Sequence, residues 1–162
     1  MAYDVEHWSD FFVGAAGASA ALAGLVFVAV SINVEAILGY EGLADRAFET
    51  VVMLLSVVVV SLVCLVPGQA TTVLGIELLV VMLLFGAGIL VLLRRSLPKV
   101  ERTQWAANAV ALALPGPAAM TVGGVSVLAE SGGGLYWIFA GSVLSLSAAV
   151  LNAWVLLVEI RR

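Results

Sequence analysis

The sequence predicts an all-α polytopic membrane protein, a bundle of five transmembrane helices. Of its 162 residues, 63% are hydrophobic and 11% are charged, and the mean hydropathy is +1.16. In soluble domains about a quarter of the residues are charged. The apolar residues gather in five segments, and each is close to the roughly 20 residues that a helix needs to cross a bilayer. We expect these spans at about 11–36, 49–67, 71–93, 104–129 and 134–158. The links are too short for a soluble domain, so residues 1–162 form a single transmembrane domain.

The positions of the basic residues predict the orientation of the bundle. All seven Lys and Arg residues lie in the first link, in or beside the third link, or at the end of the chain. With five spans these places share one side, and cytoplasmic segments carry the excess of basic residues. We therefore expect the N-terminus outside and the C-terminus inside. Trp8, Tyr136 and Trp137 would lie at the outer interface and Trp105 at the inner one. The first ten residues carry three acids and no Lys or Arg, so we expect no cleavable signal peptide.

The first span is rich in small residues. Ten of the eleven residues from Gly14 to Gly24 are Gly, Ala or Ser. Steps of three and four place Gly14, Gly17, Ala21 and Gly24 on one helical face. Each Gly costs a helix about 1 kcal/mol relative to Ala, and small residues offset this in lipid by letting helices pack closely. We expect this helix at the centre of the bundle, with its small face in contact within one subunit or between subunits.

The string ASAALAGLVFVAVSIN, residues 18–33, resembles the opening span of small uncharacterised bacterial multi-span membrane proteins. The resemblance covers only the first span, and that family supplies no activity. It implies a bacterial origin, and so a place in the bacterial cytoplasmic membrane.

The second and third spans differ in their polar content. The second is rich in Val and Leu, and we expect it to face lipid. Pro67 and Gly68 end it, so a short link joins the two spans as an antiparallel hairpin. The third contains Glu77, and an acid at membrane depth costs between about 3 and more than 10 kcal/mol. Either Glu77 belongs to an ion or proton site, or it reaches the headgroups or stays protonated in the interior.

The fourth span is interrupted by Pro115, Gly116 and Pro117 near its middle. Proline removes a backbone donor and clashes with the preceding turn, so we expect a kink or break that frees carbonyl groups. Such carbonyls bind ions in discontinuous transporter helices, but helix kinks also occur without any ligand.

Polar residues of three spans lie toward the predicted cytoplasmic side. Ser31 and Glu35 of the first span, with Asn33, would meet Asn108 and Asn152 there. The group would bind a cation or a polar solute, or would join the helices by hydrogen bonds. The fifth span carries a polar seam on one face, formed by Ser142, Ser145, Ala149, Asn152 and Glu159.

The chemistry of an enzyme is not indicated. The only histidine, His7, lies in the acidic N-terminal segment, and the only cysteine, Cys64, lies in an apolar run. Metal-ligand, nucleophile and phosphate-binding motifs are absent from the sequence, as is a buried axial ligand for haem. We expect no catalysis, no metal, no cofactor and no nucleic-acid partner.

These features predict a homo-oligomeric channel or permeation protein for an ion or small solute. Its partners would be the lipid bilayer, further copies of itself and a monovalent cation or proton. Five short-looped spans leave little room for a pathway within one subunit, whereas a ring of subunits can build one between them. The alternative is a non-catalytic accessory or scaffold subunit that binds another membrane protein or lipid.

Overall fold

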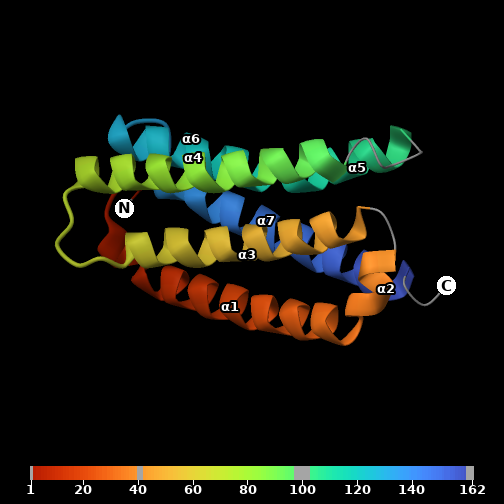
Figure 1. Cartoon of the computed structure of the whole chain (residues 1–162). Coiled ribbons are helices and arrows are strands. Elements are labelled where there is room, and N and C mark those ends of the chain that lie inside the picture. Colours follow the sequence, from red (N-terminus) through yellow and green to blue (C-terminus); the bar gives the residue numbers. More distant parts are fainter. Residues whose placement is uncertain (1, 40–41, 97–102, 160–162) are drawn as a thin grey trace.

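A computed structural model describes residues 2–39, 42–96 and 103–159 of the chain, without the side chains of 96, 103–106 and 155–159. Every regular element in this part of the chain is a helix (Figure 1). A short 3-10 helix, η1 (Val5–Trp8), leads into seven α-helices. They are α1 (Ser9–Ile32), α2 (Val34–Gly39), α3 (Leu43–Cys64), α4 (Thr71–Ser96), α5 (Thr103–Ala113), α6 (Pro115–Leu128) and α7 (Leu135–Glu159).

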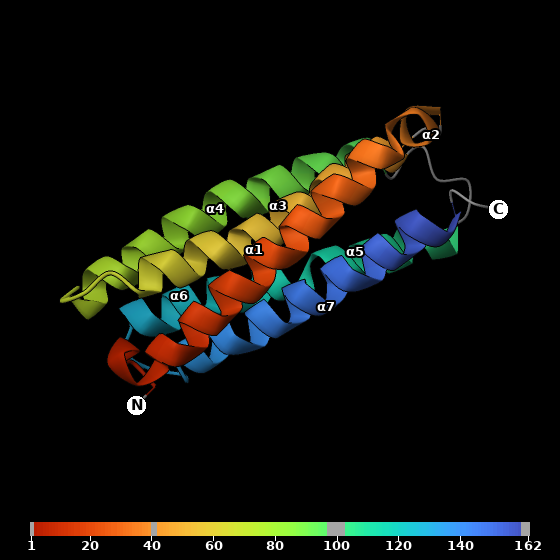
Figure 2. The ribbon, with the colours of Figure 1, turned by 90° about the horizontal axis from the view of Figure 1, so that it is seen from below.

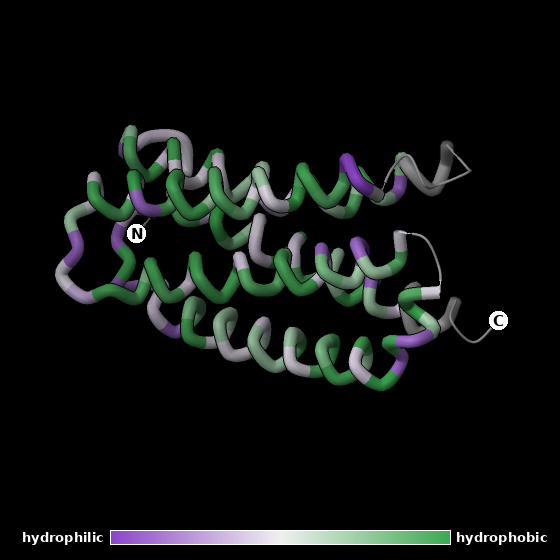
Figure 3. Tube along the Cα trace, in the orientation of Figure 1, coloured by the Kyte–Doolittle hydropathy of each residue, from purple (hydrophilic) through white to green (hydrophobic). Residues whose placement is uncertain are grey.

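Five helical segments are long and apolar enough to cross a membrane, as the sequence predicts. They are α1 with η1, α3, α4, the end of α5 joined to α6, and α7. They run antiparallel in sequence order, so the start of α1 and the end of α7 lie at opposite ends of the bundle (Figure 1). We call these the amino end and the carboxyl end. Hydrophilic residues gather at both ends and apolar residues fill the length between them (Figure 3).

The helix at the centre of the bundle is α3, which packs against α1, α4 and α7. Within the described residues, 56% of the α3 span is buried but only 17% of the span that contains α1. Two predictions are therefore wrong: the first span is peripheral in the bundle, and the second lies mostly inside it, although Leu55 and Leu62 are exposed. The error has a physical cause, because apolar side chains gain little by leaving hydrocarbon for a protein interior, so hydropathy does not reveal which span is enclosed.

Glycines produce the closest helix contacts in the interior. A Cβ on Gly75 of α4 would lie 2.8 Å from Leu128 Cβ of α6. On α7, a Cβ on Gly141 would lie 2.8 Å from the carbonyl oxygen of Gly116. Side chains at these positions would separate the helices, so α6 packs tightly between α4 and α7 because glycine is present.

The predicted interruption of the fourth span is confirmed at Leu114, between α5 and α6. Backbone bonds from Leu114 N to Val110 O (3.1 Å) and from Ala118 N to Leu114 O (3.0 Å) bridge the break. Pro115 and Pro117 have no N–H, so two carbonyls of the preceding turn lose their usual helical donors.

The amino end is closed by the first residues of the chain. Ala2 O accepts a 2.8 Å hydrogen bond from Leu135 N, which attaches the N-terminal segment to the start of α7. Trp8 packs edge-to-face on Tyr136, with ring centroids 4.8 Å apart. Trp137 lies at the same end, as predicted, whereas the side chain of Trp105 is outside the described part of the structure.

Candidate functional site

Glu77 lies near the amino end, about 9 Å of helix rise from the start of α4. Its side chain is half-buried, and its Oε2 accepts a hydrogen bond from Gln69 Nε2 in the α3–α4 link. The amide Oε1 of Gln69 is buried without a hydrogen-bond partner. Glu77 is therefore hydrogen-bonded to the α3–α4 link at the end of the bundle and is not enclosed at the middle of the bundle.

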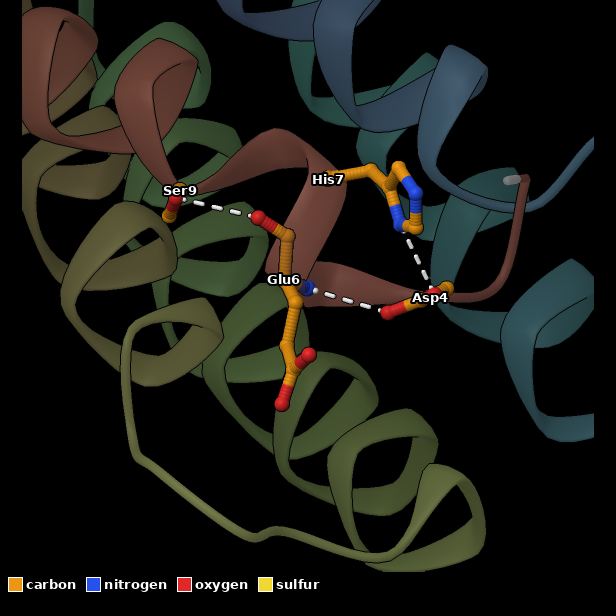
Figure 4. Close-up of polar contacts among 4 residues, drawn as sticks. All are labelled: Asp4, Glu6, His7 and Ser9. Atoms are coloured by element: carbon orange, nitrogen blue, oxygen red, sulfur yellow. Dashed lines mark hydrogen bonds and ion pairs between the residues drawn. The ribbon is translucent and has the colours of Figure 1, made fainter.

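A hollow of about 480 Å³ lies at the same end, between the N-terminal segment and the α3–α4 link. Asp4, Glu6 and Ser9 line one side and Gln69 the other. The Asp4 carboxylate is turned to His7, with 2.8 Å between Oδ2 and Nδ1, and the Glu6 carboxylate points away from it (Figure 4). The described residues hold no group of three His, Cys, Asp or Glu side chains able to bind a metal ion.

The residues expected to form a polar group toward the predicted cytoplasmic side are at the carboxyl end, but the structure does not bring them together. Ser31 and Glu35 are exposed on α1 and α2, and Ser31 Oγ donates to Phe27 O of its own helix at 2.8 Å. Asn108 is exposed on α5, whereas Asn152 is buried on α7. These positions do not line one interior path in the described subunit.

The polar seam of the fifth span does face the interior. Ser142, Ser145, Ala149 and Asn152 are all buried on α7, and the side chain of Glu159 lies outside the described residues. Ser145 Oγ has no hydrogen-bond partner and lies beside Gly116, where an added Cβ would overlap it. The structure thus joins the seam to the Pro-Gly-Pro break. Gly116 and Pro117 are buried there, and Pro115 is exposed.

The sequence analysis missed the most deeply buried acid among the described residues. Glu49 is 2% exposed on α3, and the charge of Arg46, one turn earlier, acts on it. It shares a face with Met53, Ser56 and Val60, which are fully buried. That spacing of four, seven and eleven residues was a readable signal. The sequence predicts a span that begins at about residue 49, which leaves Glu49 at its edge. The helix begins six residues earlier, at Leu43, so Glu49 lies within it.

The small-residue face of α1 has no neighbour among the described residues. Gly14, Gly17, Ala21 and Gly24 are exposed, and nothing lies within 4 Å of a Cβ added to any of the three glycines. The opposite face of α1 contacts the bundle, where Ser19 Oγ donates to Leu54 O of α3 at 2.7 Å. This face was expected to pack within or between subunits, and the first of these possibilities is excluded for the described residues. We call these four residues the open stripe.

The fold and this geometry define an all-helical protein whose five apolar segments suit a membrane. Comparison with known proteins gives no matching family model, no matching curated protein and no matching solved structure. The resemblance of the first span to bacterial membrane proteins therefore stays a prediction.

Proposed function

We propose that this chain is the subunit of a homo-oligomeric membrane protein that passes a monovalent cation, a proton or a small polar solute. The open stripe of α1 is the observation that carries the proposal. Three glycines in one helix cost about 3 kcal/mol of helix propensity relative to alanine, and no contact inside the subunit offsets this cost. A second copy packed on the stripe would offset it, because glycines allow backbones to approach closely in lipid.

The pathway in this proposal runs between subunits. The centre of the subunit is filled by fully buried apolar side chains, among them Met53, Val57 and Met120. The polar residues expected along a path lie partly inside and partly outside the bundle. Glu77 would stand at the mouth of the pathway, where a ring of acids from several subunits attracts cations.

We propose that the amino end lies on the outer, periplasmic side of the bacterial cytoplasmic membrane. Arg46, Arg94 and Arg95, the described residues among the seven basic ones, all belong to the carboxyl end, whereas Glu77 and Glu130 belong to the amino end. Lys99, Arg102, Arg161 and Arg162 lie outside the described residues. Since cytoplasmic segments are enriched in Lys and Arg, the carboxyl end faces the cytoplasm.

Reporter fusions test this orientation. We expect a reporter active only in the periplasm to be silent when fused after Arg162 and active when inserted at 130–134, in the α6–α7 link. The reverse pattern would refute the assignment.

Cation flux through reconstituted protein tests the function. We expect Glu77→Gln to reduce flux at low salt by about threefold, because one charge about 6 Å from a cation in watery surroundings contributes about 0.7 kcal/mol. Gln keeps the shape and hydrogen-bonding reach of Glu, so the oligomer should persist. Glu130→Gln, an exposed acid at the same end, is the matched control and should leave flux unchanged.

The alternative function is a non-catalytic accessory or scaffold subunit. The packed interior favours it, since the described subunit holds no continuous polar path by itself. Parent protein that forms oligomers but passes no ion or solute in the flux assay would overturn the permeation proposal in favour of this role.

A further inference from the structure

A groove separates α1 from α7 toward the carboxyl end of the bundle. At the amino end Phe11 of α1 contacts Phe139 of α7, with ring centroids 5.3 Å apart, and in the view of Figure 2 the two helices are drawn apart toward the carboxyl end. A cavity of about 240 Å³ lies between them, with Leu22 and Ala29 on the α1 side, Leu54 of α3 behind, and Ala149, Ala153 and Trp154 on the α7 side. Leu25 and Trp154, at 67% and 68% exposed, also line it, so the groove is open to the surroundings of the bundle.

The lining suits a ligand without hydrogen-bonding groups. Among the described residues that line it, Asn33 and Trp154 are the only ones whose side chains carry a polar atom. The Asn33 side-chain Nδ2 donates to Ala29 O at 2.8 Å, so this donor is satisfied within the segment. The backbone carbonyl of Leu54, on α3 at the back of the groove, accepts a hydrogen bond from the Ser19 hydroxyl. A polar solute in the groove would therefore lose its water without gaining equivalent hydrogen bonds.

The position of the groove indicates what fills it. Apart from Asn33 and Ile37, its described lining belongs to α1, α3 and α7, which are apolar enough to span a membrane, so in a bilayer its open side would meet hydrocarbon. A further helix, about 10 Å wide with its side chains, would have to pack over the groove rather than lie inside it. An empty apolar cavity would lose the dispersion contacts of its lining, which a flexible hydrocarbon chain restores.

We propose that this groove binds one acyl chain of a bilayer lipid. The chain lies between α1 and α7, with its headgroup at the carboxyl end near Trp154, a residue type that favours the interface. The open stripe is on the other side of α1, away from Ala15, Ser19 and Val26, which face the bundle. Of the groove residues, Leu25 lies one turn after Ala21 and borders the open stripe, so the lipid site adjoins the proposed subunit contact but does not depend on it or on permeation.

Native mass spectrometry of detergent-purified, delipidated protein tests the site, with phosphatidylglycerol or phosphatidylethanolamine added back. We expect one retained lipid per subunit and similar retention of both lipids, because the groove recognises the chain. Ala153→Phe and Ala29→Phe fill the groove from opposite walls. Each should weaken retention about tenfold, the effect of displacing about two buried methylene groups.

Ala118→Phe is the matched control, since Ala118 is exposed on α6 and does not line the groove. It should retain lipid like the parent. Circular dichroism and gel filtration verify that each variant is folded, and two groove variants are used so that one misfolded protein does not decide the outcome. Retention that is equal in parent and groove variants, or that depends only on headgroup charge, would overturn the proposal. Groove variants that lose oligomers instead of lipid would also overturn it, because a second copy would then occupy the groove.

Discussion

The helices α1 and α3 lie side by side and have similar lengths, 24 and 22 residues, yet they use their surfaces in opposite ways. α3 is rich in Val and Leu and packs against α1, α4 and α7, with Glu49, Thr50, Ser56 and Ser61 buried among them. α1 is rich in Gly and Ala and turns its glycines outward, where no residue of the subunit approaches.

The contrast teaches how to interpret small residues in a membrane helix. A glycine stripe shows how closely a neighbour can approach, but not which chain supplies the neighbour. The interior contacts that depend on glycine lie between α6 and α7, at Gly116 and Gly141, and between α4 and α6, at Gly75. The open stripe of α1 is thus surplus to the fold of the subunit. The experiments below test this difference between α1 and α3, from the largest expected effect to the smallest.

A charge reversal should give the largest difference, between a buried position on α3 and an exposed one on α2, which directly follows α1. Glu49→Lys places a second cation beside Arg46 in the buried part of α3, so we expect a loss of more than about 3 kcal/mol in the free energy of unfolding. Glu35→Lys on the exposed surface of α2 should change it by less than about 0.5 kcal/mol. Unfolding in mixed detergent micelles measures both. Similar losses would contradict the burial of Glu49.

The open stripe should affect assembly without affecting the subunit. Gly17→Leu and Gly24→Leu hold a neighbouring backbone away, so we expect oligomer formation in detergent to weaken by at least about tenfold, while helical content and subunit stability persist. Ala118→Leu, a similar enlargement of an exposed small residue, is the control.

Gly123→Leu provides the opposite case. A side chain there would meet Ile138 of α7, so folding of the subunit itself should fail. Gly17→Leu protein that assembles as well as the parent would show that the stripe is not a contact between subunits.

The smallest expected effect concerns the bond between the two helices. Ser19→Ala removes the hydroxyl that donates to Leu54 O, and such interhelical bonds in membranes contribute about 0.6 kcal/mol on average. Ser31→Ala removes an exposed hydroxyl that bonds only within α1, so its effect on unfolding should be near zero. A loss for Ser31→Ala as large as that for Ser19→Ala would mean that the α1–α3 bond contributes nothing specific.

The sequence alone determined the class of the fold. Five apolar segments of sufficient length, with a Pro-Gly-Pro interruption in the fourth and a polar face on the fifth, were all readable because each depends on spacing or covalent geometry within one helix. The sequence also shows that the glycines of α1 would allow another helix to approach closely, because this too depends on their spacing within one helix.

Only the tertiary structure decided which helix lies at the centre and which way each polar residue faces. Glu49 and Asn152 are enclosed, whereas Glu35 and Asn108 are exposed. In water, burial and hydrophobicity rise together, so composition indicates the core. In lipid, apolar residues are stable both outside and inside the bundle, and helix placement depends on side-chain fit between segments far apart in the chain.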